Sequence, residues 1–191
     1  LGRKGIIFAY DEAQNLADSM AQSALAHTEL AIHLMSERIG SDDINHHAMN
    51  VGVLSMMLAR ELKAPDAAVK LIGLGALFHD IGRSEVPQRI LRKTTPLTRA
   101  EQEELERHCP AGVAIGERMH LPPEALVIIA QHHENVDGSG YPKKLRGPQI
   151  SLLSRIVALT NTYERLCNPV FAGFALTPHD ALSTLWGQRR N

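Results

Sequence analysis

The sequence predicts an all-α protein, and three observations support that fold class. Apolar residues recur at the helical spacings of three and four along almost all of the 191 residues. No stretch shows the sustained alternation, bounded by hairpin turns, that indicates strands. The composition, with 44% hydrophobic and 21% charged residues, is that of a globular protein able to bury a core. We expect a helical bundle over residues 43–191, preceded by an N-terminal helical segment over residues 1–42.

The N-terminal segment contains one long predicted helix, from about Asp11 to Ile39. Its strongly apolar positions, Leu16, Met20, Leu30 and Leu34, follow the spacing of a short coiled-coil seam. Two interpretations stay open at this point. The helix either forms a homodimer with a second copy of the chain or packs on its own domain.

The second predicted helix covers about residues 43–62, and the third covers residues 67–78. The buried stripe of the second helix is expected at Val51, Leu54, Leu58 and Leu62, with His47 one turn before it. The third helix is so apolar that other elements must surround it. It ends in His79-Asp80, which places an acid against the core.

Capping signals mark the later helices. Thr98 and Glu101 form a capping box, which opens a helix that carries His108 near its end, where Pro110 disturbs it. Pro122 and Pro123 start a helix in which His132 shares the apolar face. Ser151 and Thr177 open the last two predicted helices.

Charge and cysteine content exclude several classes of protein. The formal net charge is -1 and no basic stripe is present, so a nucleic-acid polymer is not an expected partner. The two cysteines, Cys109 and Cys167, form no disulfide framework, which is typical of a reducing compartment. No apolar run reaches the roughly 20 residues of a membrane span. We expect a cytoplasmic protein that acts on a small substrate.

Polar side chains recur on the inner side or at the end of four predicted helical segments. They are His47, His79, Asp80, His108, His132 and His133. One such histidine alone is more often a hydrogen-bonded core residue, but five of them with a buried acid indicate a shared metal site. Imidazole and carboxylate suit iron, manganese, zinc, cobalt or nickel, and Asp80 can bridge two ions about 3.5–4 Å apart. Two such cations favour phosphodiester hydrolysis.

The stretch HHENVDGSGYP places a flexible turn directly after His132 and His133. By itself the sequence Gly138-Ser139-Gly140-Tyr141-Pro142 is only a turn. Beside two candidate ligands, it can bring backbone N–H groups and an aromatic ring to a substrate.

Together, His47, the HDIG stretch at residues 79–82, His108 and the GYP stretch at residues 140–142 resemble the HD-GYP family of bacterial cyclic di-GMP phosphodiesterases. The resemblance covers about residues 45–185. It implies an all-helical HD fold and a centre of two or three metal ions, usually iron or manganese. It also implies cleavage of cyclic di-GMP by a metal-bound hydroxide to pGpG and onward to GMP.

Carried over position by position, the resemblance implies two groups of metal ligands that share Asp80. The first group is His47, His79 and Asp80, and the second is Asp80, His108, His132 and His133. Asp43 would bind a third ion. The loop residues Gly138, Gly140, Tyr141 and Pro142 would border the substrate, and the loop would also dock on diguanylate cyclase (GGDEF) domains.

The chain departs from the family pattern at three places. Asn161 stands where the family has an aspartate ligand, so it offers an oxygen without charge, and Glu164 is a candidate to compensate. Arg83 replaces a lysine after HDIG and can clamp a phosphate but not release a proton. Residues 168–172 replace a segment that contacts the nucleotide.

Two function classes stay open. In the first, the protein is a phosphodiesterase in which Asp80 bridges the ions and Arg83 holds the phosphate. In the second, the changes at Asn161 and Arg83 leave a weakly active or inactive receptor for cyclic di-GMP, or a protein-interaction module. A third interpretation keeps the catalysis but changes the substrate to another cyclic dinucleotide or to a nucleotide phosphate.

Overall fold

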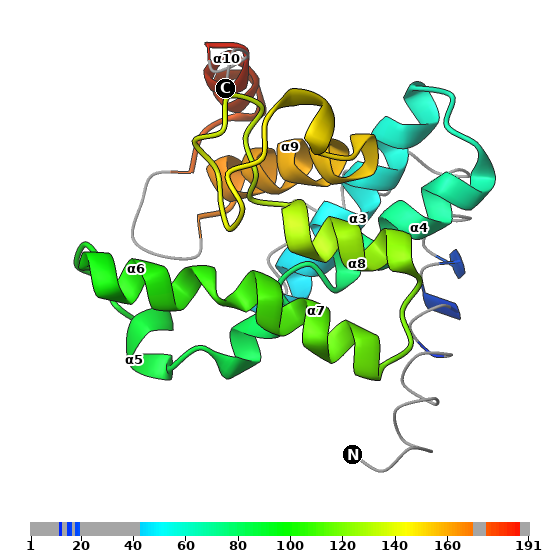
Figure 1. Ribbon diagram of the computed structural model, residues 1–191. Helices are drawn as coiled ribbons and strands as arrows, with labels where there is room; N and C mark the ends of the chain where they lie inside the picture. Colours follow the sequence, from blue (N-terminus) through cyan, green and yellow to red (C-terminus); the bar gives the residue numbers. More distant parts are fainter. Residues whose placement is uncertain (1–11, 13–14, 17, 20–42, 170–174, 188–191) are drawn as a thin grey trace.

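The computed structural model describes residues 12, 15–16, 18–19, 43–169 and 175–187 (Figure 1). Within these ranges the protein is helical and contains no strand, which confirms the predicted all-α class. The longer helices are α3 (Asp43–Glu61), α4 (Asp66–Leu77), α6 (Arg99–Glu106), α7 (His108–Arg118), α8 (Pro123–Gln131), α9 (Leu152–Cys167) and α10 (Pro178–Gly187). The short ones are η1 (Ile81–Glu85), α5 (Gln88–Leu91) and η2 (Gly147–Gln149).

The core lies between α3, α4, α8 and α9, and Figure 1 shows α8 crossing in front of α3 and α4. Its buried residues are Val51, Met56, Ala59, Val69, Ile72, Ala76, Ile128, Ile156 and Val157. Each fully buried aliphatic side chain of this kind contributes about 1.5–3 kcal/mol to folding. The apolar third helix of the sequence prediction is α4, which contacts α3, α8 and α9.

The buried stripe of α3 differs from the predicted one. Leu62 is 57% exposed, because α3 ends at Glu61 and Leu62 lies beyond the last helical turn. Ser55, Met56 and Ala59 are buried instead. Ser55 is tolerated there because its hydroxyl bonds the Thr160 hydroxyl of α9 at 2.6 Å.

Local capping predictions are confirmed at α6. The Thr98 side chain accepts from the Glu101 N–H, and the Glu101 carboxylate accepts from the Thr98 N–H. The prediction for His108 is wrong in one respect: α6 ends at Glu106, and His108 begins α7. Pro110 therefore lies in the first turn of a new helix, where its missing N–H has no intrahelical acceptor to lose.

Most of the predicted N-terminal helix lies outside the described residues, and with it most of the proposed dimer seam. Residues 12, 15–16 and 18–19 are helical. Asp18 forms an ion pair of 2.9 Å with Lys70 on α4, so this part of the segment contacts its own domain. The boundary between residues 42 and 43 and the homodimer stay predictions. Among the helices described, none is long and apolar enough to span a bilayer.

Candidate metal centre

The five histidines and the aspartate predicted to bind metal come from four places in the bundle. His47 lies on α3, His79 and Asp80 follow the end of α4, His108 begins α7, and His132 and His133 follow α8. All are buried except His133, which is partly buried. Helix ends thus bring five of the six side chains to one point.

The ligand atoms fall into two groups. One consists of His47, His79 and Asp80, and the other of Asp80, His108, His132 and His133. Within each group the atoms lie within 4.8 Å of one another. Asp80 belongs to both groups, so its carboxylate lies between them.

The two oxygens of Asp80 face different groups. Oδ2 lies 3.5 Å from Nε2 of His79 and 3.9 Å from Nε2 of His47. Oδ1 lies 3.3 Å from Nε2 of His108 and 3.6 Å from Nε2 of His132. The carboxylate can therefore give one oxygen to each group.

Three imidazoles are oriented by the carbonyls at the ends of the preceding helices. Nδ1 of His79 donates to the Ala76 carbonyl at 2.6 Å, and Nδ1 of His108 donates to the Leu105 carbonyl at 2.7 Å. Nδ1 of His132 likewise donates to the carbonyl of Ile129 at 2.9 Å. Such carbonyls lack an intrahelical donor. Because Nδ1 keeps the proton, Nε2 presents its lone pair to the site.

His47 is oriented by a carboxylate instead. Its Nδ1 lies 2.5 Å from Oε2 of Glu164 on α9. Oε1 of Glu164 accepts from the amides of Asn50 and Asn168. Glu164 was considered above as a ligand that compensates for Asn161. Its carboxylate instead contacts Nδ1 of His47, and Nε2 of that imidazole faces the site.

Burial favours the neutral form of three of the histidines, while the aspartate favours its charged form. Burial lowers the pKa of His79, His132 and His133, the first and last well below the ordinary value. Burial raises the pKa of Asp80, but the nearby imidazoles, His79 first, and the Arg83 guanidinium outweigh it and leave the pKa well below its usual range. Neutral imidazoles and an ionised carboxylate are the protonation states that bind metal.

The donor set fits a divalent cation. Oδ1 of Asp80 and Nε2 of His133 are buried and have no hydrogen-bond partner among the described residues, which is costly unless a cation satisfies them. The Nε2 atoms of His47 and His79 lie 3.2 Å apart, and those of His108 and His132 lie 3.3 Å apart. Two ligands bound to one ion at about 2.0–2.1 Å are spaced by roughly 3 Å.

Two arginines approach the shared carboxylate. Nη1 of Arg83 lies 3.2 Å from Oδ2 of Asp80, and Nη2 of Arg165 on α9 donates to the same oxygen at 3.1 Å. Nε of Arg165 also donates to Oδ1 of Asn161, which is buried. Sequence reasoning missed Arg165, although its position one helical turn after Asn161 was a usable signal. Asp43 begins α3, but its side chain lies outside what the structure describes.

The GYP loop packs directly on the second group. The Tyr141 ring stacks on His133, with centroids 4.6 Å apart and planes at 26°. Its N–H donates to the His133 carbonyl, and the peptide bond to Pro142 is cis. A Cβ on Gly140 would lie 2.3 Å from the Asn135 nitrogen, so only glycine permits this approach. Gly138, with φ of 83°, lies in the turn at the tip of the loop.

Glu134 holds the far side of this loop, and sequence reasoning did not identify it. The buried carboxylate accepts from the N–H groups of Lys143 at 2.6 Å and Leu145 at 2.8 Å.

Glu134→Ala removes both charged acceptors, and we expect it to lower the free energy of unfolding by about 1–3 kcal/mol in urea denaturation. The exposed Glu117 on α7 is the control, and Glu117→Ala should change stability little. Equal stability of the two variants would contradict this role.

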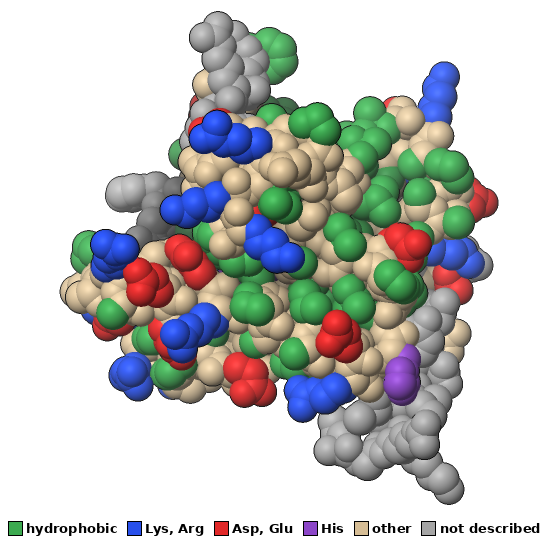
Figure 2. Space-filling model, in the orientation of Figure 1, with side chains coloured by type: hydrophobic (Ala, Val, Ile, Leu, Met, Phe, Trp, Pro, Cys, Tyr) green, Lys and Arg blue, Asp and Glu red, His purple; other side chains and the backbone are tan. Residues whose placement is uncertain are grey.

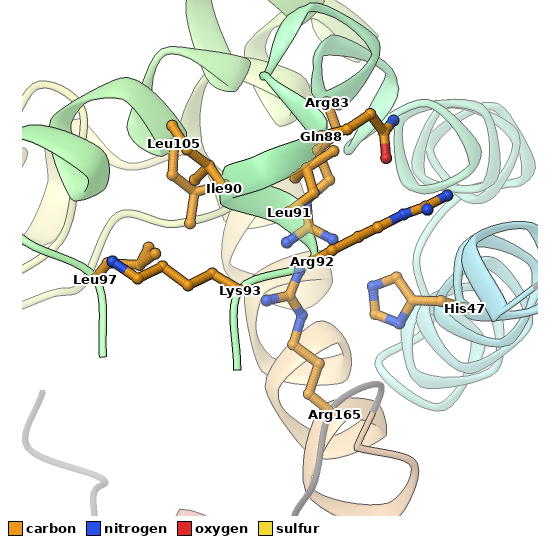
Figure 3. A pocket seen from close by; sticks show the side chains of 10 residues that line it. All are labelled: His47, Arg83, Gln88, Ile90, Leu91, Arg92, Lys93, Leu97, Leu105 and Arg165. Carbon is orange, nitrogen blue, oxygen red and sulfur yellow. The ribbon is translucent and has the colours of Figure 1, made fainter. Parts of the chain in front are cut away.

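A cavity of about 460 Å³ opens beside the first group (Figure 3). It is lined by His47, Arg83, Gln88, Ile90, Leu91, Arg92, Lys93, Leu97, Leu105 and Arg165. Figure 3 shows Arg165 reaching into it from α9 and His47 lying at its edge. Four cationic side chains and an apolar wall suit a ligand with phosphates and flat rings. By contrast, basic and acidic side chains are interspersed over α5 and α6 on the face in Figure 2.

Comparison with known proteins agrees with this architecture. The model of the HD domain family matches residues 14–191. The cyclic di-GMP phosphodiesterase PA4108 of Pseudomonas aeruginosa is 36% identical over 159 residues, covering 81% of this chain and 37% of that protein. The 3'3'-cGAMP-specific phosphodiesterase 1 of Vibrio cholerae is 33% identical over 120 residues, covering 63% of this chain and 28% of that protein.

The fold also matches a solved structure, Bd1817, an HDG"Y"P protein from Bdellovibrio bacteriovorus. The TM-score is 0.81 at 24% identity, over 96% of this chain and 59% of that chain. The chain spans only 34–37% of the length of the first curated relatives it matches. The chain belongs to the HD domain family, and its His79-Asp80 and Gly140-Tyr141-Pro142 motifs place it among the HD-GYP proteins of that family.

Proposed function

We propose that the chain is a metal-dependent phosphodiesterase that hydrolyses cyclic di-GMP to pGpG, GMP or both. The observation that carries this proposal is the pair of ligand groups that share Asp80, next to a cavity lined by arginine and lysine. The curated relatives named as cyclic di-GMP phosphodiesterases support the choice of substrate.

We propose a binuclear centre of iron or manganese, the metals that the family resemblance implies; the donor set itself also accepts zinc, cobalt and nickel. His47, His79 and Asp80 would hold one ion, and Asp80, His108, His132 and His133 the other. Asn161 and Asp43 are the proposed oxygen ligands for a weaker or third ion. Cations held by the two ligand groups would supply Lewis acidity, which stabilises charge on a phosphate and lowers the pKa of a bound water.

The protein's own residues supply binding and orientation. Arg83, partly buried beside Asp80, is placed to hold a phosphate through its guanidinium fork, but it does not protonate the leaving oxygen. The Tyr141 ring stacks on His133, which keeps that imidazole in place and closes one side of the site. Gly138, Gly140 and Pro142 shape the loop that would border the nucleotide.

The expected partners and compartment follow from the same residues. The GYP loop, exposed at Ser139 and Pro142, is the surface we propose for docking on GGDEF domains. The N-terminal helix remains the proposed homodimer contact. Cys109 and Cys167 are free thiols, which supports the cytoplasm as the expected compartment.

A receptor is the second candidate function, and one observation favours it. Asn161 is neutral, and Arg165 donates to both Asn161 and Asp80, so positive charge already lies where a cation would bind. A protein with this arrangement could bind cyclic di-GMP while hydrolysing it slowly.

The decisive experiment prepares the protein without oxygen, counts bound metals, and follows cyclic di-GMP and 3'3'-cGAMP in parallel. We expect hydrolysis of cyclic di-GMP that a chelator abolishes and added Mn²⁺ restores. Tight binding of cyclic di-GMP without product in the metal-loaded protein would instead establish the receptor. Faster hydrolysis of 3'3'-cGAMP would correct the substrate.

Arg92 provides a test of the cavity as the substrate site. Among the described residues no acidic group lies within ion-pair distance of Arg92, whereas Lys93 pairs with Glu101 at 2.5 Å. Arg92→Ala should raise KM for cyclic di-GMP by about 10-fold or more, because a charge-assisted bond to phosphate contributes about 1.5–3 kcal/mol. Arg89→Ala, on the short helix α5 that Arg92 follows but not among the residues lining the cavity, should leave KM unchanged. Equal KM values in both variants would contradict this assignment.

A further inference from the structure

We propose that Arg165 competes with a metal ion for Asp80, so that the two ligand groups bind cations with unequal affinity and in sequence. The inference rests on the metal binding that the proposed function requires. It assigns to Arg165 a positioning role in which the guanidinium occupies the first group, His47-His79-Asp80, until a cation displaces it.

The contacts of Arg165 define the competition. Its Nη2 donates to Oδ2 of Asp80 at 3.1 Å, and its Nε donates to Oδ1 of Asn161 at 3.1 Å. Oδ2 is the oxygen that faces His79 and His47, the other members of the first group. The Arg83 guanidinium lies 3.2 Å from the same oxygen. A cation in the first group must share Oδ2 with two positive charges.

The second group is free of this competition. Oδ1 of Asp80 faces His108 and His132; within the part of the chain that the structure describes, neither this oxygen nor the buried Nε2 of His133 has a hydrogen-bond partner. The second group therefore offers four donors, one of which is the unshared Oδ1 of Asp80. The first offers three donors, with neutral Asn161 held by Arg165. Because affinity for hard cations rises with ligand charge, the second group should bind first.

Arg165 is also able to leave Asp80. Its side chain is 36% exposed and lines the cavity together with Arg83 and Arg92. Release from Asp80 would therefore return the guanidinium to an open, polar space rather than to the core. A swing of this kind opens the first group and at the same time places a cation among the other cavity arginines.

The test is a titration of the chelator-treated full chain with Mn²⁺ in the absence of oxygen, followed by calorimetry and by the Mn²⁺ paramagnetic resonance signal. For the wild-type protein we expect the second group to bind one ion tightly and the first group to bind another at least about 10-fold more weakly. Arg165→Ala should lower the dissociation constant of the weaker ion alone, by about 10-fold, because it removes a like charge in direct contact with the Asp80 ligand. Arg89→Ala removes a charge from α5 at a residue that does not line the cavity, and it should leave both dissociation constants unchanged.

Arg165→Gln keeps most of the side-chain volume and carries the test if the alanine variant unfolds. Asn161→Asp should also lower the dissociation constant of the weaker ion. The effect should be larger in the Arg165→Ala variant than in the wild-type protein, because Arg165 would otherwise neutralise the new carboxylate. Two equally tight ions in the wild-type protein, or unchanged constants in both Arg165 variants, would overturn the inference and leave the proposed function intact. Absence of any Mn²⁺ binding would overturn both.

Discussion

Replacing Asp80 with alanine is expected to reduce kcat for cyclic di-GMP hydrolysis by more than about 100-fold. Loss of an outer hydrogen-bond partner of a metal ligand already costs about 10- to 100-fold, and Asp80 is the residue common to both ligand groups. The same variant should lose bound metal, because each group keeps only imidazoles. Metal counting and product analysis on one anaerobic preparation measure both effects.

Asp80→Asn separates charge from shape in this experiment. It keeps the volume of the side chain but offers one carbonyl oxygen, so we expect it to bind less metal than the wild-type protein and to be nearly inactive. Asp66→Asn is the matched control, because Asp66 is 78% exposed at the start of α4 and pairs only with Arg60 among the described residues. Wild-type hydrolysis by Asp80→Ala would rule out the proposed role.

Replacing Gly82 with alanine is expected to lower the free energy of unfolding by about 3 kcal/mol or more. A Cβ at this position would lie 2.0 Å from the His108 carbonyl oxygen and 2.4 Å from the Gly112 nitrogen. Both are backbone atoms of α7, so no side-chain rotation can relieve the clash. The helix η1 would have to separate from α7, and His108 would move away from Asp80.

Urea denaturation of the metal-free protein measures this effect without interference from bound ions. Gly187→Ala is the control. Gly187 ends α10, and a Cβ there would have no contact within 4 Å in the described part of the chain, so alanine should be neutral or stabilising by up to about 1 kcal/mol. Unfolding midpoints that agree between the two variants would show that η1 and α7 are not in contact as described.

Much of the fold was predictable because its signals are local. The Thr98 capping box and the Ser151 N-cap require only residues three positions apart, and both form as predicted. The position of His108 was mispredicted because a proline such as Pro110 is compatible with two local structures. It can end one helix, or it can lie in the first turn of the next. In the structure Arg107 is the C-cap of α6 and the N-cap of α7, so the second reading is correct.

The predicted site residues are brought together, but their surroundings were less accessible. Glu164 was considered as a ligand that compensates for Asn161, whereas its carboxylate lies against Nδ1 of His47. Glu134 carries no motif, since its role depends on the path of a loop that folds back over it. Both contacts are specific to the three-dimensional arrangement of elements that are distant in the sequence.

The sequence by itself determined where helices form, which side chains are able to bind metal, and which family the chain resembles. Periodicity, caps and motifs depend only on residues that are close together in the sequence. Only the tertiary structure decided which oxygen of Asp80 faces which group and that Arg165 bonds one of them. That bond joins residues 85 positions apart, on α9 and at the end of α4. It forms because α9 packs against α3 and α4, which brings the Arg165 guanidinium next to the Asp80 carboxylate. No local sequence pattern predicts such a contact.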